Sequence, residues 1–207
     1  MKFVEGNVYH VYNQGNNGRI VFQSREDYIN FLWLTKDLIG AVSNIICYCL
    51  LPDQFNLMLY ADERCKHLQK QGGLLLDPIT NGIRRLLSGY ARVYNQKYGQ
   101  SGSLFRQKTR AKCLSDPPSL YLSTHTFPDY CRNCFIYIHQ LPLRSNLVKK
   151  PGDWEFSSFM DYAGLRKGTL CNRELASKYC AYDAINFLSL LNESIPNEIM
   201  AGLFVLH

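Results

Sequence analysis

The sequence predicts an α+β fold in which helices pack on an antiparallel sheet. The composition, 46% hydrophobic, 19% charged and 13% aromatic over 207 residues, is that of a globular protein with a substantial core. Short runs with strand character alternate with longer amphipathic runs, in the order βαββαβα followed by small helices. Two strand-like runs follow each other directly and predict a hairpin, which is typical of an antiparallel sheet.

The first part of the chain supplies a strand, a helix and the hairpin. Residues 8–12 are β-branched or aromatic and predict the first strand. Residues 24–39 begin with a serine that can cap a first turn and continue with an apolar stripe, so they predict a helix. Residues 43–51 and 55–61 predict the two hairpin strands. Residues 62–77 are polar and glycine-rich and predict a flexible link.

The clearest helix covers residues 83–98, where apolar and tyrosine side chains recur at spacings of three and four. This spacing places Tyr90, Tyr94 and Tyr98 on one face of the helix. Packing in the core is the simplest role for these tyrosines, and stacking on nucleic-acid bases is the alternative. Residues 104–114 predict a further strand.

The last third of the chain predicts helices of different lengths. Ser115 begins one helix, and a second should start near Asp129 and end before Pro142, because Pro128 and Pro142 interrupt helices. The sequence predicts a main domain and a C-terminal helical extension. The main domain covers residues 1–165 and the extension covers residues 166–207. Within the extension we expect two short helices, over 172–179 and 182–193, followed by an apolar tail over 195–206.

Positive charge is concentrated in one segment. The net charge is 23 − 17 = +6, and residues 78–115 contain no Asp or Glu. A phosphate backbone is the natural partner of such a segment, and a solvated basic face is the alternative. In a strand over 104–114 the last four cations would share one face, about 6.6 Å apart. The basic residues of the segment are Arg84, Arg85, Arg92, Lys97, Arg106, Lys108, Arg110 and Lys112.

The sequence favours a cytoplasmic protein without a membrane partner. It contains no apolar run of about 18 residues, and its first residues lack the core of a signal peptide. Eight cysteines are therefore expected as thiols. The C-x-C at 47–49 and the C-x2-C at 131–134 lack a partner pair of matching spacing, because Cys171 and Cys180 lie nine residues apart. Burial as small apolar residues is thus preferred over a zinc site.

Four stretches together resemble the single-tyrosine transposases of insertion sequences, which include the REP-associated tyrosine transposases. The resemblance runs in order over roughly residues 6–165. It implies a ferredoxin-like fold, a homodimer, and cutting and rejoining of single-stranded DNA beside hairpins. The stretches are VYHVYNQG (8–15), YARVYNQKYGQSGSLF (90–105), YIHQLPLRS (137–145) and WEFSSF (154–159).

The resemblance implies that Tyr137 is a nucleophile, since it occupies the family's tyrosine position. A tyrosine, with a pKa near 10, attacks poorly without help. Family members use a divalent metal, Mg or Mn, as a Lewis acid on the scissile phosphate. A His-hydrophobic-His pair on a central strand and a polar residue on the tyrosine helix hold that metal. The alternative role of Tyr137 is that of a half-buried residue on an amphipathic helix.

All three ligand positions differ in this chain. Gln54 and Asn56 stand in place of the two histidines, and Leu141 stands one turn after the tyrosine. Strand alternation places Gln54 and Asn56 on one face. Carboxamides are neutral, weak ligands that suit hard cations only within an oxygen-rich set. We therefore expect a degenerate site without a metal cofactor.

Other side chains offer a poor replacement for these ligands. Asp53 alternates to the opposite face of the strand, and Gln140 lies three residues after the tyrosine. His10, His125 and His139 are more typical of hydrogen-bonded structural residues than of ligands.

The preferred hypothesis is a transposase-like protein that binds single-stranded or hairpin DNA and cuts it little or not at all. Lys108 and Arg110 fall on basic positions of the family's strand. One alternative is an active transposase with an atypical metal site that uses Asp53, Gln140 or His10. A second alternative is a remnant that contacts only proteins, through the apolar tail 195–206.

Overall fold

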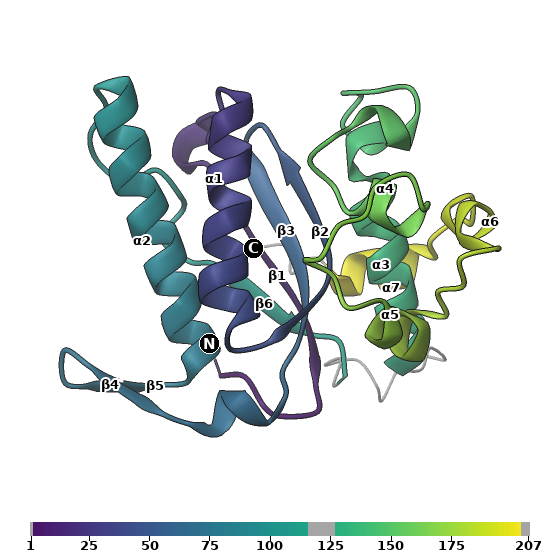
Figure 1. The fold of residues 1–207 in the computed structure, drawn as a ribbon, viewed down its shortest axis with the longest axis horizontal. Helices are drawn as coiled ribbons and strands as arrows, with labels where there is room; N and C mark the ends of the chain where they lie inside the picture. Colours follow the sequence, from purple (N-terminus) through teal and green to yellow (C-terminus); the bar gives the residue numbers. More distant parts are fainter. Residues whose placement is uncertain (1, 116–126, 204–207) are drawn as a thin grey trace.

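The computed structural model describes residues 2–115 and 127–203 (Figure 1). Residues 116–126 lie outside the described residues. They include His125 and the residues of the helix that was predicted to begin at Ser115. The main elements follow the chain as β1 (Val8–Gln14), α1 (Arg25–Thr35), β2 (Asn44–Leu51), β3 (Gln54–Tyr60), β4 (Gln69–Gln71), β5 (Leu74–Leu76), α2 (Pro78–Tyr98), β6 (Arg110–Cys113), α3 (Phe127–Arg144), α4 (Phe159–Tyr162), α5 (Arg173–Cys180), α6 (Phe187–Leu191) and α7 (Asn197–Leu203).

The four long strands form one antiparallel sheet in the order β2-β3-β1-β6. Strand β1 lies between β3 and β6, and the hairpin of β2 and β3 forms as predicted. A β-α-β-β-α-β succession with this order is the ferredoxin-like arrangement. The predicted fold class, an α+β sandwich with a ferredoxin-like sheet, is confirmed.

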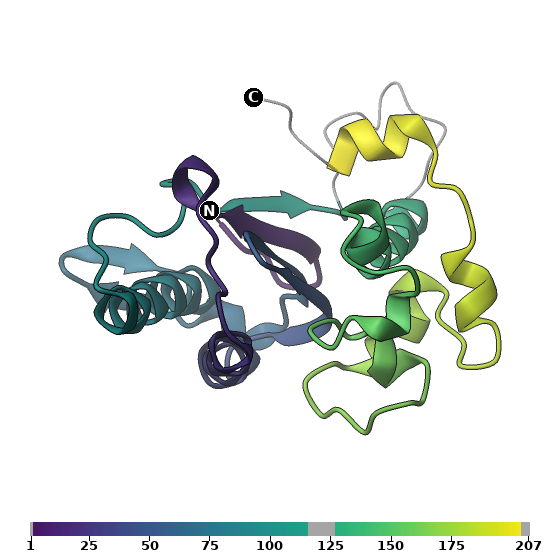
Figure 2. The same cartoon turned by 90° about the horizontal axis from the view of Figure 1, so that it is seen from above.

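Helices α1 and α2 cover one face of the sheet, and α3 with the C-terminal helices covers the other (Figure 2). The core under α1 and α2 is rich in aromatic side chains. Phe31 of α1 is fully buried among the rings of Phe22, Phe55, Tyr90 and Phe105, with centroids 5.1 to 6.3 Å away. Offset and edge-on ring contacts of this kind stabilise a core beyond the area that they bury.

The core on the α3 face contains smaller side chains next to the sheet. The thiols of Cys47 and Cys49 on β2 and of Cys131 and Cys134 on α3 are all buried here. No disulfide forms between them, and each behaves as a small apolar residue, as predicted. Burial raises the pKa of these four thiols, so all of them stay protonated.

The C-terminal helices extend this second core. Helices α5, α6 and α7 all contact α3, and their buried residues belong to the same cluster as the residues of α3. The helix predicted over 172–179 forms as α5 (Arg173–Cys180), and part of the helix predicted over 182–193 forms as α6 (Phe187–Leu191). The tail predicted over 195–206 contains α7 (Asn197–Leu203). The division at residue 165 stays a prediction. No helix among the described residues is long and apolar enough to cross a membrane.

The strand predicted over 104–114 is wrong in its first half. Strand β1 pairs with this segment at Tyr12↔Arg110 and again at the bridge Gly15↔Phe105. Between these two pairs β1 advances by three residues and the opposite segment by five. The extra residues bulge out of the ladder and are held by the buried Asn13, whose Nδ2 donates to Arg106 O (3.0 Å) and Thr109 Oγ1 (2.9 Å). The four cations of this segment therefore do not form one regular row.

Two further predictions need correction. Helix α3 does not end before Pro142 but continues through it to Arg144. The proline lies in the last turn, where it removes one backbone hydrogen bond, and the burial of Leu141 beside it favours the helical path. The link predicted over residues 62–77 contains the small hairpin of β4 and β5, with Gly72 and Gly73 at positive φ in its turn.

A candidate tyrosine site with a basic border

Polar residues form a stripe on the sheet face that α3 covers in part. Strand β1 places His10, Tyr12 and Gln14 on this face, and β3 places Gln54 and Asn56 beside them, with the pairs Tyr12↔Asn56 and Gln14↔Gln54. Strand alternation puts the neighbours of these residues in the aromatic core on the other face. The two carboxamides therefore share one face, as strand alternation predicts.

The buried pair of His10 and Asn56 lies at the centre of the stripe. The ring Nε2 of His10 donates to Asn56 Oδ1 at 3.0 Å, and both residues are at most 1% exposed. Burial lowers the pKa of His10 to about 4, so the ring is neutral at pH 7. Among the described residues no acceptor lies within hydrogen-bond reach of Asn56 Nδ2. The Asn56 oxygen, which is the atom of this side chain that could bind a metal, is thus already hydrogen-bonded to His10.

Tyr137 reaches the stripe from α3. Cys134, Tyr137 and Leu141 follow at spacings of three and four, so they share the helix face that packs on the sheet. The Tyr137 ring lies 6.4 Å from the His10 ring, edge to face, and the guanidinium of Arg144 lies 5.6 Å above the Tyr137 ring. Burial raises the pKa of Tyr137, and the charge of Arg144 lowers it less. The half-buried phenol is therefore protonated at neutral pH.

Of the alternative metal ligands that the sequence offers, His10 lies within the stripe and Gln140 points away from it. Asp53 lies in the two-residue turn between β2 and β3, outside both strands. Gln140 donates to Leu191 O at 2.8 Å and accepts from Arg144 Nε at 3.0 Å, pointing to the C-terminal helices. His139 is buried between Phe135 O and Ser158 Oγ, each 2.9 Å away.

These donors do not fit the divalent metal that the resemblance implies. Asn56 Oδ1 is occupied by His10, Gln54 offers a neutral amide, and Leu141 is apolar and buried. Within residues 2–115 and 127–203 no three His, Cys, Asp or Glu side chains gather closely enough to hold an ion. A hard cation prefers carboxylate and water oxygens, and none of the three positions supplies a carboxylate.

Strand β6 adds a basic border to the tyrosine site. Arg110 pairs with Tyr12 and Lys112 pairs with His10, so both cations stand on the same face as the stripe, partly exposed. Arg106 and Lys108 are exposed in the bulge. With its amide oxygen turned toward Arg106, Gln14 accepts from Arg106 Nε at 2.7 Å. Burial lowers the pKa of Lys112.

The cations of α2 lie on the opposite side of the sheet from Tyr137. Arg84, Arg85 and Arg92 are exposed. Lys97 is engaged in an ion pair with Asp27 at 2.9 Å and in a second with Glu26 at 3.2 Å. Structural pairing of this kind makes Lys97 a poor phosphate ligand.

The tyrosines of α2 serve mainly as core residues. Tyr90 and Tyr94 are 1% and 2% exposed, and their hydroxyls donate to Val21 O and Ile20 O. The hydroxyl of Tyr98 donates to Asp27 at 2.7 Å. Packing in the core is the role that the structure gives this face, and Tyr90 and Tyr94 leave no ring surface for bases.

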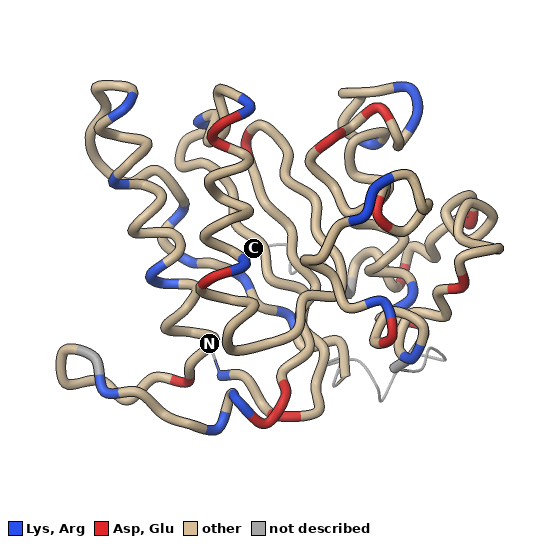
Figure 3. Tube along the Cα trace, viewed as in Figure 1, with Lys and Arg blue, Asp and Glu red and all other residues tan. Residues whose placement is uncertain are grey.

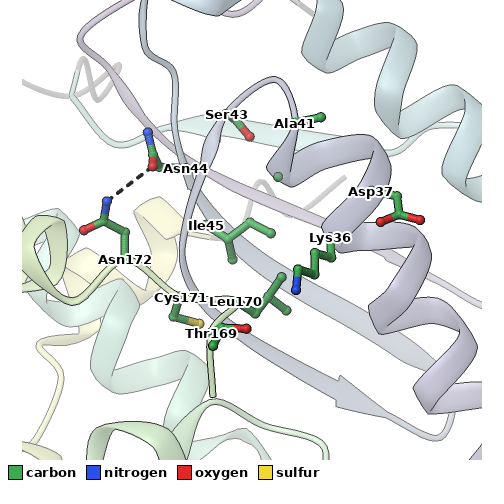
Figure 4. A pocket seen from close by; sticks show the side chains of 11 residues that line it. Lys36, Asp37, Ala41, Ser43, Asn44, Ile45, Thr169, Leu170, Cys171 and Asn172 are labelled. Atoms are coloured by element: carbon green, nitrogen blue, oxygen red, sulfur yellow. Dashed lines mark hydrogen bonds between the residues drawn. The ribbon is translucent and has the colours of Figure 1, made fainter. Parts of the chain in front are cut away.

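A pocket of about 670 Å³ lies at the other edge of the sheet, beside β2 (Figure 4). It is bounded by the turn after α1 and by residues 169–172, with Asn172 Nδ2 donating to Asn44 Oδ1 at 3.3 Å across it. Lys36 and Asp37 contribute one charge of each sign. The pocket contains none of the predicted site residues.

Two residues of the tyrosine site were missed in the sequence. Tyr12 stacks on His10 with a centroid distance of 4.7 Å, and Arg144 lies over Tyr137. Both carry a signal in the sequence, because Tyr12 is two residues after His10 on a strand and Arg144 is two helical turns after Tyr137.

No protein-family model and no curated protein matches the sequence. Among solved structures, a REP-associated tyrosine transposase bound to a REP hairpin has a similar fold, with a TM-score of 0.51 and 14% identity. That match covers 83% of this chain and 92% of the transposase chain. A bacterial tRNA(His) guanylyltransferase (Thg1)-like protein in complex with ATP matches at a TM-score of 0.35 and 13% identity over 77% of this chain and 73% of that chain, too low to support an inference.

Proposed function

We propose that this chain is a DNA-binding protein of the single-tyrosine transposase type that recognises single-stranded or hairpin DNA and has little or no cleavage activity. The observation that carries the proposal is the surroundings of Tyr137. This tyrosine faces a polar stripe bordered by Arg110 and Lys112. In that stripe Asn56 stands where the resemblance implies a metal ligand, and its side-chain oxygen is already hydrogen-bonded to His10.

The DNA part of the proposal is supported by the fold and by the charge. The transposase with a similar fold is bound to a DNA hairpin. In this chain Arg110 and Lys112 stand beside the tyrosine, and Arg106 and Lys108 extend the basic border along the bulge. Each phosphate that such a border neutralises releases counterions, so affinity should fall steeply as salt rises.

The loss of cleavage follows from the chemistry of the phenol. Attack on a phosphodiester needs a phenolate or a strong Lewis acid on the phosphate. Burial raises the pKa of Tyr137 and so disfavours the phenolate. Gln54 and Asn56 offer no charge to hold a cation, and the neutral His10 adds none.

Binding is tested with a fluorescent hairpin and a single-stranded oligonucleotide at several salt concentrations. The variant Arg110→Glu/Lys112→Glu should weaken binding and reduce the slope of log K against log salt by roughly two, about one for each lost contact. The matched control is Lys149→Glu/Lys150→Glu, with the same charge change at exposed positions outside β6. Absence of DNA binding at low salt would favour the protein-contact remnant.

Cleavage is tested by incubating the protein with hairpin DNA and Mg²⁺ or Mn²⁺ and separating products on a denaturing gel. We expect no covalent protein–DNA adduct from either the natural chain or Tyr137→Phe. An adduct that forms with the natural chain and disappears in Tyr137→Phe would overturn the inactive site and establish an active transposase.

A homodimer is part of the same proposal, because the resemblance implies one. Light scattering at several protein concentrations, with and without hairpin DNA, measures the mass directly. A mass of two chains supports the dimer, and a mass of one chain with DNA bound rules it out for binding.

A further inference from the structure

A groove of about 440 Å³ lies between α2 and residues 102–109, and the tyrosine site does not include it. We name it the α2 groove. Leu87 and Ala91 of α2 give it a partly exposed apolar wall above the buried Ile83 and Leu104, and the exposed Arg84 and Arg106 also line it. The volume is that of a site for a small organic group.

The loop wall of the groove is held in place by side-chain hydrogen bonds. Asn13 bonds Arg106 O and Thr109 Oγ1 from the sheet, and Asn95 Nδ2 donates to Gly102 O at 3.0 Å from α2. The residues that bulge from the β6 ladder form this wall. The bulge thus creates a preformed concave surface between a helix and an edge strand, which lowers the ordering cost of binding.

The groove carries positive charge without compensation from its own walls. Every lining residue falls between 80 and 109, inside the segment 78–115 that has no Asp or Glu. Figure 3 shows the basic residues of α2 with no acidic residue along the helix. Arg84 and Arg106 therefore favour an anion at the rim, while the apolar walls favour a flat organic group below it.

Arg106 connects the groove to the face of the tyrosine site. It lines the α2 groove, and its guanidinium also lies against Gln14, which belongs to the polar stripe. Arg110 follows on β6, the outermost strand of the sheet on this side. Cations therefore continue from the α2 groove around the β6 edge to the surroundings of Tyr137.

We infer that the α2 groove binds a nucleotide of single-stranded DNA, with its base and sugar on the apolar walls and its phosphate on Arg84 and Arg106. The strand then passes around the β6 edge toward Tyr137. A duplex is excluded from such a groove, because its bases are stacked inside the helix and present no free face. The inference rests on the proposed DNA binding and adds a second contact region to it.

The charge at the rim is tested by anisotropy with a short fluorescein-labelled oligothymidine. Arg84→Glu should weaken binding about tenfold or more, because it replaces a phosphate contact by a repulsion. The matched control is Arg85→Glu, the next residue on the same exposed helix surface, which does not line the groove. It changes the same net charge and should weaken binding at most about threefold.

The apolar wall is tested with Ala91→Leu, which fills the groove without changing charge. Affinity should fall several-fold while the dependence on salt stays unchanged. The control Val93→Leu adds volume on an exposed part of α2 outside the groove and should have no effect. Circular dichroism melting curves establish that each variant is folded before binding is compared.

The outcomes separate this inference from the proposed function. If the natural chain binds no single strand at low salt, the proposed function itself fails. If the natural chain binds but Arg84→Glu and Arg85→Glu lose the same affinity, or Ala91→Leu loses none, binding is a general effect of charge and the groove is not a site. Displacement of the oligonucleotide from the natural chain by an acidic peptide with equal affinity would also overturn the inference.

A position-specific readout completes the test. An oligonucleotide with iodouridine in place of thymidine is crosslinked by ultraviolet light, and the modified peptides are identified by mass spectrometry. Crosslinks on α2 or residues 102–109 support the groove. Crosslinks confined to α3 and β1 would place the strand on the tyrosine face alone.

Discussion

The two faces of one sheet differ in the side chains that lie next to the strands. On the α1 and α2 face, Phe31, Phe55 and Tyr90 pack as an aromatic cluster. The α3 face also has buried aromatic rings, but next to the strands it carries thiols and a buried polar pair, His10 and Asn56. Residues that alternate along the same strands therefore serve stability on one side and a polar site on the other.

This difference indicates where the protein retains features that stability alone does not favour. A buried amide and a buried imidazole cost free energy unless both are fully hydrogen-bonded. Asn56 Nδ2 has no acceptor within the described part of the chain. The cost falls on the face that carries Tyr137, which is where a functional requirement would offset it.

The largest expected loss of stability comes from a substitution in the aromatic core under α1 and α2. Phe31→Ala should reduce the free energy of unfolding by about 3–5 kcal/mol, because it removes a fully buried ring with four aromatic neighbours. Urea unfolding followed by circular dichroism measures the change. The control Trp33→Ala, at a site 60% exposed on the same helix, should change stability by less than about 1 kcal/mol. Equal losses would show that α1 is not anchored through this cluster.

Lowering the pH should act on the α3 face. Burial lowers the pKa of His10 and of His139 to about 4, below the value of about 6.5 for an unfolded chain. The unfolded state then binds more protons between these values, so stability is full above pH 6.5 and is lost as pH falls toward 4.

Each histidine should contribute a loss of about 2 kcal/mol between pH 7.5 and pH 5, measured by urea unfolding at both values. His10→Gln and His139→Gln should each remove about half of the dependence. A flat profile in the natural chain would mean that the two rings are protonated in the fold.

The polar pair itself should have a smaller effect. Asn56→Leu should cost about 1–3 kcal/mol, because it leaves the buried His10 Nε2 without the oxygen that it bonds. The double variant His10→Leu/Asn56→Leu should recover much of that loss, since both polar groups are then gone. Thermal and urea unfolding of the three proteins measure the coupling. A double variant that is less stable than Asn56→Leu alone would contradict this expectation, because removal of the second polar group would then bring no recovery.

The smallest expected effect concerns two glycines of α2. At Gly89 an added Cβ meets no atom within 4 Å, so Gly89→Ala should stabilise the helix by about 0.5–1 kcal/mol. At Gly82 the same atom would lie 2.5 Å from Leu38 O, so Gly82→Ala should destabilise the protein. Melting temperatures of both variants measure the difference. Effects of equal sign would contradict the close contact between α2 and the turn after α1.

The elements with strong periodicity were predictable, and those decided by long-range contacts were not. The helix over 83–98 lies within α2, and the hairpin of β2 and β3 forms as predicted, because patterns of 3.6 and 2 residues reflect local burial. The strand over 104–114 was predicted too long, since the alternation of cations continues through a bulge that Asn13 holds from another strand.

The candidate site shows the same division. Alternation alone places Gln54 and Asn56 together, and the resemblance points to Tyr137. The structure adds what no spacing expresses, namely the bond from His10 to Asn56 and the direction of Gln140 toward the C-terminal helices. It also pairs Lys97, one of the predicted phosphate ligands, with Asp27.

The sequence by itself determined the chemical inventory: a phenol, two amides where a ligand pair is expected, and an acid-free basic segment. It also determined the order of strands and helices, because hydrophobic periodicity is a local property. Only the tertiary structure decided which polar groups share a face, which cations are engaged in ion pairs, and that the β6 bulge and α2 enclose a groove. These features depend on contacts between residues far apart in the chain, and such contacts leave no periodic trace in the sequence.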